Sequence, residues 1–353
     1  MALQQLRSKI DALDKKIVTL INDRAQISLS IGHEKIKSGQ PIYAPARELD
    51  VLNRIKALNK GPMTAKAFEA IYREVMSASL ALEKPLNIAY MGPEATFSHL
   101  AALKRFGSSV NYVACDNFGD VFQRVTNGGA DYGVVPIENS IEGVVSHTMD
   151  ILVETDLKIC SQILLDVSHH LMAKCTFNKI KVIYSHPQVF GQCRHWLLSN
   201  FPKTELVSVV STTKAAQLAA AKKDAACICS AIAAQLYGLD VLKEDIQDSA
   251  HNITRFLVIA NNDVPRTGHD RTSMVFAVKD KSGALHDMLA PFKRYNINLT
   301  KIESRPSKKK AWEYYFFVDC QGHAKDPHVA KAISLLEGKS KFFKILGSYP
   351  VAD

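Results

Sequence analysis

Basic residues near the start of the chain have the spacing of an anion-binding site. Arg24 falls on the apolar seam of a predicted helix of about 35 residues, and an unpaired cation in such a seam costs stability. Lys35 follows within ~20° of Arg24 around the helix and ~16 Å along its axis. Two long cationic side chains at this spacing can close on one small dianion. The alternative is a structural ion pair between Arg24 and a neighbouring carboxylate.

Arg7 is a third basic residue of the same predicted helix. It lies about 25 Å from Arg24 along the axis and on a different face. Arg7 can therefore reach the same ligand only from an antiparallel partner chain. This geometry predicts an intertwined dimer whose sites are shared between subunits, and a higher oligomer is compatible with it.

Thr254-Arg255-Phe256 is the second candidate for chemistry, and it leads directly into the apolar run Leu257–Ala260. A hydroxyl and a guanidinium at the mouth of a buried strand cost stability unless something binds there. As a weak acid, Thr254 is suited to donate a hydrogen bond rather than a free proton. Arg255 could hold a carboxylate or form a structural salt bridge. An ordinary polar strand end is the alternative.

The elements that position the first set of residues form a predicted all-α domain, residues 1–84. After the long helix, Pro45 suits the first turn of a second helix. A third helix is predicted from about Thr64. Three helices around a polar site are therefore expected. The further candidate residues on the shorter helices are Arg47, Glu48, Ser79 and Glu83.

The pattern of Arg7, Arg24, Lys35, Arg47, Glu48, Ser79 and Glu83 closely resembles the all-helical chorismate mutase family. The resemblance implies that Arg24 and Arg7 of the partner subunit hold the two carboxylates of chorismate. Lys35 and Glu83 are implied to hydrogen-bond its ether oxygen, for which Glu83 must be protonated. The remaining three would orient the substrate and bind its hydroxyl. Such a rearrangement needs only a folded substrate conformer and donors aimed at developing negative charge.

From residue 85 to 265 the sequence changes to short β-rich runs alternating with helical ones, which is typical of α/β architecture. A two-lobed domain resembling periplasmic binding proteins is expected, with the strand after Thr254 crossing back to the first lobe. The predicted strands are Leu86–Met91, Ala130–Ile137, Lys158–Gln162, Leu164–Ala173, Val182–Tyr184, Ala225–Cys229 and Phe256–Ala260.

Three separated motifs of this segment resemble prephenate dehydratase: Val135–Gly143, Tyr184–Gln188 with Gln192, and Thr254–Phe256. The resemblance implies a substrate site with Thr254 as its essential hydroxyl. Loss of carbon dioxide and of the ring hydroxyl from prephenate restores aromaticity, so a donor near the departing hydroxyl is the main requirement. The other residues carried over are Asn139, Ser185 and Gln192, and Arg255 is a further candidate.

The last segment, residues 270–353, has the predicted order βαββαβ, which is ferredoxin-like. Its strands are predicted at Ser273–Lys279, Asn298–Glu303, Trp312–Cys320 and Phe342–Ile345. Two motifs, Gly283-Ala284-Leu285 and Glu303-Ser304-Arg305-Pro306, resemble the ACT regulatory module of prephenate dehydratases. The resemblance implies that phenylalanine binds there as an effector, at a subunit interface.

Composition excludes several other functions. The chain has 353 residues, 47% hydrophobic and 22% charged, as expected for two or three globular domains. Neither a run of ~20 apolar residues nor an export signal is recognisable, so a cytoplasmic protein is expected. The net charge of +9 fits small anionic substrates. Neither nucleic acid nor membrane is an expected partner, because the only dense basic run, Lys308–Lys310, lies in a predicted loop.

Neither a metal nor a cofactor is expected. The seven cysteines include no Cys-x-x-Cys pair, which favours reduced, buried thiols. Cys227 and Cys229 are expected to point to opposite faces of a strand. The pair His169-His170 is interpreted as structural or substrate-facing.

Taken together, the chain resembles the bifunctional chorismate mutase–prephenate dehydratase family with a C-terminal ACT domain. Two alternatives stay open from the residues. The first is a monofunctional dehydratase whose helical segment is a degenerate dimerisation arm, although Arg24 is a poor residue for a pure dimer seam. The second is a phenylalanine-binding regulator without catalysis.

Overall fold

The computed structural model describes residues 2–249, 251–279, 281–308 and 313–351. They form two compact units. The first combines the chain up to Ile88 with Arg105–Tyr112, and the second combines Ala89–Lys104 with the chain from Val113 onward. None of the helices in the described chain has the length and apolar character that crossing a membrane requires.

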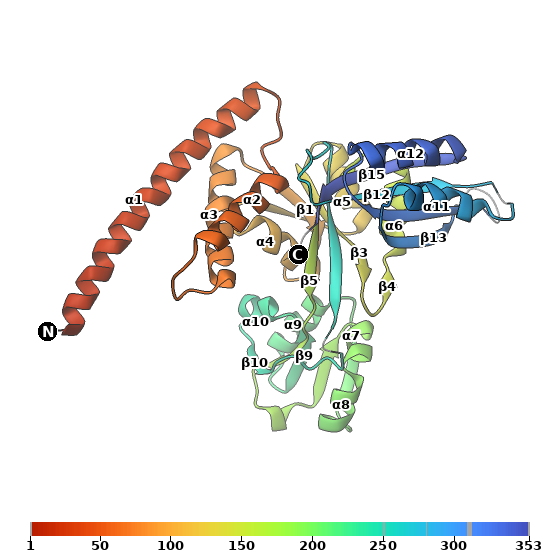
Figure 1. Cartoon of the computed structure of the whole chain (residues 1–353). Coiled ribbons are helices and arrows are strands. Elements are labelled where there is room, and N and C mark those ends of the chain that lie inside the picture. The colour runs from red at the N-terminus through yellow and green to blue at the C-terminus, as the bar shows by residue number, and fades with distance from the viewer. Residues whose placement is uncertain (1, 250, 280, 309–312, 352–353) are drawn as a thin grey trace. The chain divides into compact units, whose positions relative to one another are not determined.

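The first unit is dominated by α1 (Ala2–Lys37), α2 (Pro45–Leu58) and α3 (Ala65–Glu83) (Figure 1). Pro45 begins α2, because its fixed φ suits a first helical turn and its missing N–H leaves no donor unsatisfied. Thr64 caps α3 through Oγ1, which accepts a hydrogen bond from the Ala67 backbone at 3.2 Å. The predicted three-helix segment is confirmed.

The apolar seam of α1 is open to solvent in the single chain. The first six apolar residues of this seam are each more than half exposed. A helix of a globular protein usually buries such a stripe against the core or another surface. These residues are Leu3, Leu6, Ile10, Leu13, Ile17 and Leu20.

The first lobe of the second unit is a mixed sheet with the strand order β2-β1-β3-β11-β5, and the short β4 pairs with β3. The strand β11 pairs antiparallel with both β3 and β5, so the late strand returns to the first lobe as predicted. The elements are β1 (Asn87–Met91), α4 (Phe97–Phe106), β2 (Asn111–Cys115), α5 (Phe118–Thr126), β3 (Tyr132–Asn139), β4 (Gly143–Val144), α6 (Ser146–Glu154), β5 (Lys158–Asp166) and β11 (Ile253–Ala260).

The second lobe is a separate sheet with the order β10-β6-β9-β7-β8. Apolar clusters of buried residues pack on it. The predicted two-lobed α/β architecture is confirmed. The elements are β6 (His170–Ala173), the 3₁₀ helix η1 (Phe177–Lys179), β7 (Val182–Ser185), α7 (Pro187–Gln192), α8 (Arg194–Asn200), β8 (Glu205–Ser208), α9 (Thr212–Ala221), β9 (Ala225–Cys229), α10 (Ala231–Tyr237) and β10 (Asp240–Lys243).

Several strand predictions need correction. The predicted strand Leu164–Ala173 is wrong, because β5 continues to Asp166 and β6 begins only at His170, after the chain has passed to the other lobe. The strands β2, β4, β8 and β10 were not predicted. The two residues of β4 are too few to show a pattern. The other three strands lie at sheet edges and alternate only weakly between buried and exposed positions, so they lack a clear apolar signal.

The expectation that Cys227 and Cys229 face opposite sides is wrong. Side chains alternate along a strand with a period of two, so residues i and i+2 share a face. Both thiols lie in the same buried cluster on β9, with 3.5 Å between the Sγ atoms.

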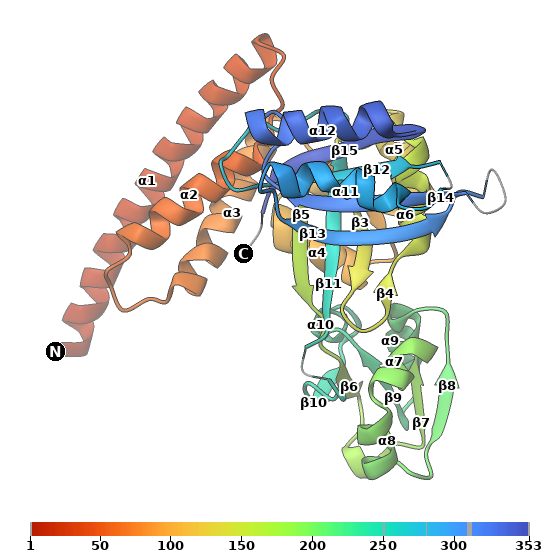
Figure 2. The same cartoon turned by 45° about the vertical axis from the view of Figure 1, so that its right-hand side comes forward.

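The C-terminal segment is ferredoxin-like, as predicted, with the sheet order β13-β14-β12-β15. Both helices lie side by side on one face of the sheet (Figure 2). Of the predicted strand Trp312–Cys320, Trp312 lies outside the described residues, and β15 extends beyond the predicted Ile345. The elements are β12 (Asp270–Ala277), α11 (Ala284–Arg294), β13 (Leu299–Pro306), β14 (Tyr314–Gln321), α12 (Pro327–Lys339) and β15 (Phe342–Pro350).

The other face of this sheet packs on the first lobe of the same unit. Along β12, Met274 and Phe276 join the cluster under the helices, whereas Val275 and Ala277 join the core of the first lobe. Gly347 of β15 lies so close to the Ile159 backbone that a Cβ would collide with the Ile159 carbonyl oxygen. The two domains therefore share one apolar core.

Candidate active sites

The first candidate site lies between α1 and α3. Lys35 Nζ is 3.2 Å from Glu83 Oε2 and donates a hydrogen bond to the Ile42 carbonyl oxygen at 2.6 Å. Arg24 Nη1 donates to Ser79 Oγ at 2.7 Å. Thus the structure brings together four of the seven residues chosen from the sequence, as two pairs one helical turn apart on α3.

Gly32 explains how α1 approaches α3 so closely. A Cβ at this position would lie 2.8 Å from Glu83 Cβ and Cγ, a separation that real side chains do not tolerate. Gly32 is also the one buried residue of α1 in the described chain. Sequence reasoning missed it, although a glycine inside a helical pattern is a recognisable signal of close packing.

Glu48 is held in a largely enclosed position, with its side chain only 13% exposed. Arg105 at the end of α4 forms an ion pair with it at 3.2 Å. Burial raises the pKa of Glu48 above its usual value, although Arg105, Tyr43 and nearby basic groups oppose the shift. Arg105 was missed in the sequence because it lies in a different segment from the helical domain.

Arg7 and Arg47 are exposed on α1 and α2. Arg7 lies more than four helical turns before Arg24 on the same helix, so a single chain does not bring it to the pairs just described.

The second candidate site is a cavity of about 300 Å³ between the two lobes of the second unit. Asn139 Nδ2 donates a hydrogen bond to Thr254 Oγ1 at 2.8 Å. This donation leaves the hydroxyl hydrogen of Thr254 free to point toward another acceptor. Gln192 lines the same cavity from the second lobe. Three of the predicted residues, far apart in sequence, therefore meet here.

A chain of amides connects the two lobes at this cavity. Asn139 Nδ2 also donates to Asn252 Oδ1 at 2.7 Å, and Asn252 Nδ2 donates to Gln192 Oε1 at 3.1 Å. Gln192 Nε2 in turn donates to Glu142 Oε1 at 3.2 Å. Asn252 and Glu142 were not chosen from the sequence, although Glu142 lies inside the Val135–Gly143 motif and Asn252 lies two residues before Thr254.

His169 completes this network at 2.6 Å from Gln192 Oε1. Because that oxygen is an acceptor, His169 Nε2 must carry the proton, and Nδ1 is the unprotonated nitrogen. Burial holds the pKa of His169 below its usual value, so the ring is neutral near pH 7. His169 lines the cavity, and this fits the substrate-facing half of its sequence interpretation.

The structure does not bring Arg255 to this cavity. Neighbouring side chains on β11 alternate, so Thr254 and Phe256 face the cavity while Arg255 and Leu257 face the ferredoxin-like domain. Arg255 instead forms ion pairs with Glu138 and Asp319. Of the two roles considered for Arg255, a substrate carboxylate or a structural salt bridge, the structure shows the salt bridge.

Ser185 is also turned away from open space. It is fully buried at the end of β7, where its Oγ donates to the Ile228 carbonyl oxygen at 2.7 Å. Its neighbour His186 lines the cavity and caps α7. The hydroxyl of Ser185 therefore holds the strand end from which α7 enters the site.

The two motifs of the ferredoxin-like domain lie on separate elements. Gly283 has a φ of 77° and precedes α11, a left-handed conformation that favours glycine. Ala284 behind it is buried, and Leu285 packs against the domain core. The residues Glu303, Ser304, Arg305 and Pro306 end β13.

Arg305 makes a contact that the sequence did not reveal. Its Nε and Nη2 donate to the two carboxylate oxygens of Asp150, on α6, at 2.9 and 3.0 Å. Such a bidentate pair is geometrically specific. Arg305 thus connects the motif on β13 with the first lobe.

Comparisons with known proteins match all three segments of the chain. Family models match three consecutive stretches: chorismate mutase type II at residues 6–84, prephenate dehydratase at 88–264 and the ACT domain at 272–336. A bifunctional chorismate mutase/prephenate dehydratase of Aquifex aeolicus is 47% identical over 99% of this chain and 98% of its own length. The chain belongs to the bifunctional chorismate mutase/prephenate dehydratase family.

Further relatives agree with this membership. The bifunctional chorismate mutase/prephenate dehydratase of Stutzerimonas stutzeri is 43% identical over 99% of the chain and 98% of its own length. The crystal structure of a prephenate dehydratase from Arthrobacter aurescens in complex with L-Phe is similar at 35% identity and a TM-score of 0.71. It covers 76% of this chain and 91% of the other.

The activities of the chain follow from its membership in this family. The chain is an enzyme of phenylalanine biosynthesis that rearranges chorismate to prephenate in its helical domain. Its α/β domain then decarboxylates and dehydrates prephenate to phenylpyruvate. The C-terminal segment is an ACT domain.

Proposed function

We propose that Thr254 donates its hydroxyl hydrogen to the departing hydroxyl of prephenate. The observation that carries this role is the hydrogen bond from Asn139 Nδ2 to Thr254 Oγ1, which occupies the oxygen as acceptor and leaves its hydrogen for the substrate. Gln192 would bind substrate from the second lobe, and His169 would hold Gln192 in its orientation. Ser185 would act indirectly, through the start of α7.

For the mutase reaction, Lys35 and Glu83 would hydrogen-bond the ether oxygen of chorismate, while Arg24 and Arg7 of the partner subunit hold its carboxylates. Their donors would then face the charge that develops in the transition state. Arg47, Glu48 and Ser79 would orient the substrate and bind its hydroxyl. The 3.2 Å Lys35–Glu83 pair and the position of Arg24 beside Ser79 support this assignment over a degenerate dimerisation arm.

The open seam of α1 supports an intertwined homodimer, because a stripe of half-exposed leucines and isoleucines is stable in water only when another surface covers it. Since Arg7 lies far from Arg24 along α1, an antiparallel copy of the chain is the occupant that would also complete the site. A higher oligomer built from such dimers is compatible with this proposal.

Phenylalanine is the proposed effector, bound at the motifs Gly283–Leu285 and Glu303–Pro306 and lowering dehydratase activity. The ACT fold of this segment and the phenylalanine complex of the Arthrobacter aurescens relative support it. We place the functional boundaries at residues 1–84, 85–265 and 270–353. Seven free cysteines support a reducing, cytoplasmic location.

A coupled assay tests these proposals together. The purified chain is supplied with chorismate, and chorismate, prephenate and phenylpyruvate are followed with and without phenylalanine. Both conversions are expected, with phenylpyruvate formation slowed by phenylalanine. Phenylpyruvate formation from prephenate that no concentration of phenylalanine changes would remove the effector role while leaving catalysis intact.

A further inference from the structure

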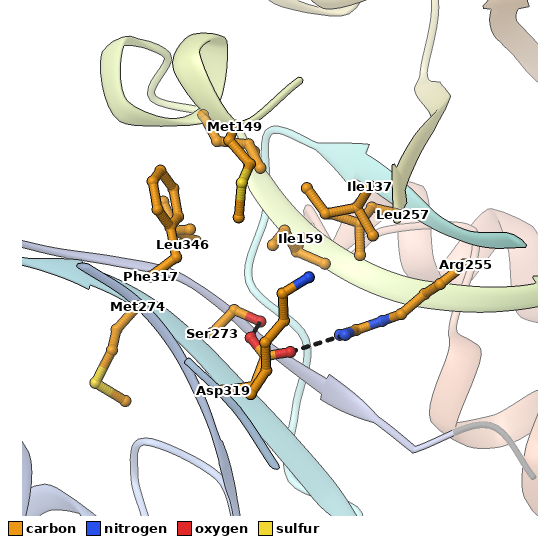
Figure 3. A pocket seen from close by; sticks show the side chains of 12 residues that line it. Ile137, Met149, Ile159, Arg255, Leu257, Ser273, Met274, Phe317, Asp319 and Leu346 are labelled. Carbon is orange, nitrogen blue, oxygen red and sulfur yellow. Dashed lines mark hydrogen bonds and ion pairs between the residues drawn. The ribbon is translucent and has the colours of Figure 1, made fainter. Parts of the chain in front are cut away.

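A buried cluster of charges joins the dehydratase domain to the ACT domain. Arg255 Nη1 lies 3.0 Å from Glu138 Oε1 and 2.8 Å from Asp319 Oδ2, and Nη2 donates to Tyr349 Oη at 2.7 Å. Figure 3 shows Arg255 reaching across a small cavity toward Asp319 and Ser273. Asp319 and Tyr349 belong to ACT strands, whereas Glu138 and Arg255 belong to the dehydratase sheet.

Lys301 closes the cluster from β13, where it forms an ion pair with Glu138. Ser273 Oγ donates to the other oxygen of Asp319 at 2.5 Å. The cluster therefore balances two cations against two carboxylates. Side chains of Arg255 and Asp319 are only 8% and 9% exposed, and removing one member would leave a buried charge without its partner, which is costly.

The cluster lies directly behind the proposed catalytic pair. In the pairing of β3 with β11, Thr254 is opposite Asn139, and Arg255 is opposite Glu138. The register then shifts between Arg255 and Phe256, and such bulges re-aim neighbouring side chains. The same two backbone segments thus present Asn139 and Thr254 to the substrate cavity and Glu138 and Arg255 to the ACT sheet.

We propose that Glu138 and Arg255 are positioning residues for the dehydratase reaction, and that Lys301, Asp319 and Tyr349 transmit the state of the effector site to them. This inference rests on the proposed roles of Thr254 and of phenylalanine.

The position of Lys301 supports the proposed transmission from the effector site to Glu138. Lys301 lies on β13, the strand that ends in the proposed effector motif. Along this strand Lys301 and Glu303 are both less exposed than the residues beside them, so the two side chains share one face. Lys301 and Glu303 both line a groove that also contains Glu138 and Asn139. A displacement of β13 on effector binding would therefore change the Lys301–Glu138 contact, one residue from Asn139.

A matched control comes from the same domain interface. Lys344 of β15 donates hydrogen bonds to backbone carbonyl oxygens at the end of α6, including that of Val153 at 3.0 Å. Lys344 therefore places a positive charge at the interface between the ACT domain and the first lobe. Its described partners do not include Glu138 or Arg255. Substitution of Lys344 should weaken docking without altering the cluster.

The experiment compares full-length wild type, Lys301→Gln, Tyr349→Phe and Lys344→Met. For each chain, dehydratase kcat and KM are measured with prephenate at zero and saturating phenylalanine. Binding of phenylalanine is measured by calorimetry, and mutase turnover of chorismate in the same preparation reports that the chain is folded. Neither Lys301 nor Tyr349 lines the substrate cavity between the lobes, and the calorimetry reports whether phenylalanine still binds to each variant.

Without phenylalanine, both cluster variants are expected to lower dehydratase kcat at least about fivefold with little change in KM. Phenylalanine should still bind, but the inhibition it causes should shrink about fivefold or more, the lower end of usual allosteric coupling. Lys344→Met should lower the Tm while changing neither quantity more than about twofold.

Unchanged kcat and unchanged inhibition in folded Lys301→Gln and Tyr349→Phe would overturn the inference. An equal loss of kcat and of inhibition in Lys344→Met would also overturn it, because the losses would then come from weakened docking of the ACT domain in general and not from this cluster. If wild type neither binds nor responds to phenylalanine, the effector proposal and the transmitting role fail together. The positioning role is then decided by kcat alone, in the absence of phenylalanine.

Discussion

Asn139 Nδ2 lies 2.8 Å from Thr254 Oγ1 and donates to it, across the pairing of β3 with β11. Asn139 Oδ1 is itself fixed, because it accepts hydrogen bonds from the backbone N–H groups of Ile141 and Glu142 at 2.9 and 3.0 Å. The orientation of the amide is therefore set by the loop that follows β3. Through it, the loop also sets the direction in which Thr254 can donate.

Replacing Thr254 by valine should remove the donor while keeping the shape of the side chain. Dehydratase kcat is expected to fall by at least about 10²-fold, the lower end of the contribution of a positioned proton donor. Thr254→Ser should retain most of the activity, because it keeps the hydroxyl. Prephenate turnover by the two variants, with chorismate turnover as the folding control, is the measurement. Substantial dehydratase activity in Thr254→Val would contradict the assignment.

Gly32→Ala should impair the mutase selectively. The new methyl group would lie 2.8 Å from Glu83 Cβ, so α1 and α3 must separate at the site. Overpacking of this kind costs about 1–3 kcal/mol, and displacement of Glu83 from Lys35 should lower mutase kcat. Ser30→Ala, on the exposed side of the same helix, is the control. Equal mutase rates in wild type and Gly32→Ala would show that the close contact is not needed.

The pH dependence of the mutase tests the role of Glu83. A carboxyl group can donate to the ether oxygen only when protonated, whereas the amide of Glu83→Gln donates at every pH. The proposed role therefore predicts that wild type and Glu83→Gln differ in how mutase turnover depends on pH. Mutase kcat measured across pH for both chains decides the question, and superimposable profiles would remove Glu83 from this role.

Glu138 should make the second unit sensitive to acid. Burial raises the pKa of Glu138, but the hydrogen bonds and charges of Lys301 and Arg255 outweigh it and hold the pKa below the ordinary value of 4.5. A depressed pKa means that the folded state prefers the charged form. Its stabilising contribution is complete above pH 4.5 and is lost as pH falls through the lower folded pKa.

The measurement is Tm against pH for wild type and Glu138→Gln. The variant should be less stable at neutral pH but lose less stability between about pH 5 and pH 3. Asp166→Asn, at the exposed end of β5, serves as a control carboxylate. An equally steep acid loss in Glu138→Gln would place the sensitive group elsewhere.

The sequence alone determined much of this protein. The seam spacing of α1 revealed Arg24 and Lys35 as a pair, because helical periodicity places residues eleven apart on one face. Changes in hydrophobic period separated the helical, α/β and ferredoxin-like segments, since each class buries its apolar residues at its own spacing. The resemblance of local motifs to prephenate dehydratase pointed to Asn139, Gln192 and Thr254. For Thr254 there was also a physical signal, because a polar side chain at the mouth of a buried strand costs stability unless something binds there.

Only the tertiary structure decided which partners these residues meet. Arg255 was ambiguous in sequence, and its salt bridge depends on Asp319, 64 residues away on another domain. The role of Gly32 became clear only from the position of Glu83, which packs against it. The edge strands could be recognised only from their pairing with neighbouring strands, because exposed strands carry little apolar pattern. Periodicity reports which face of an element is buried. It does not report what lies against that face, because that depends on how distant segments pack.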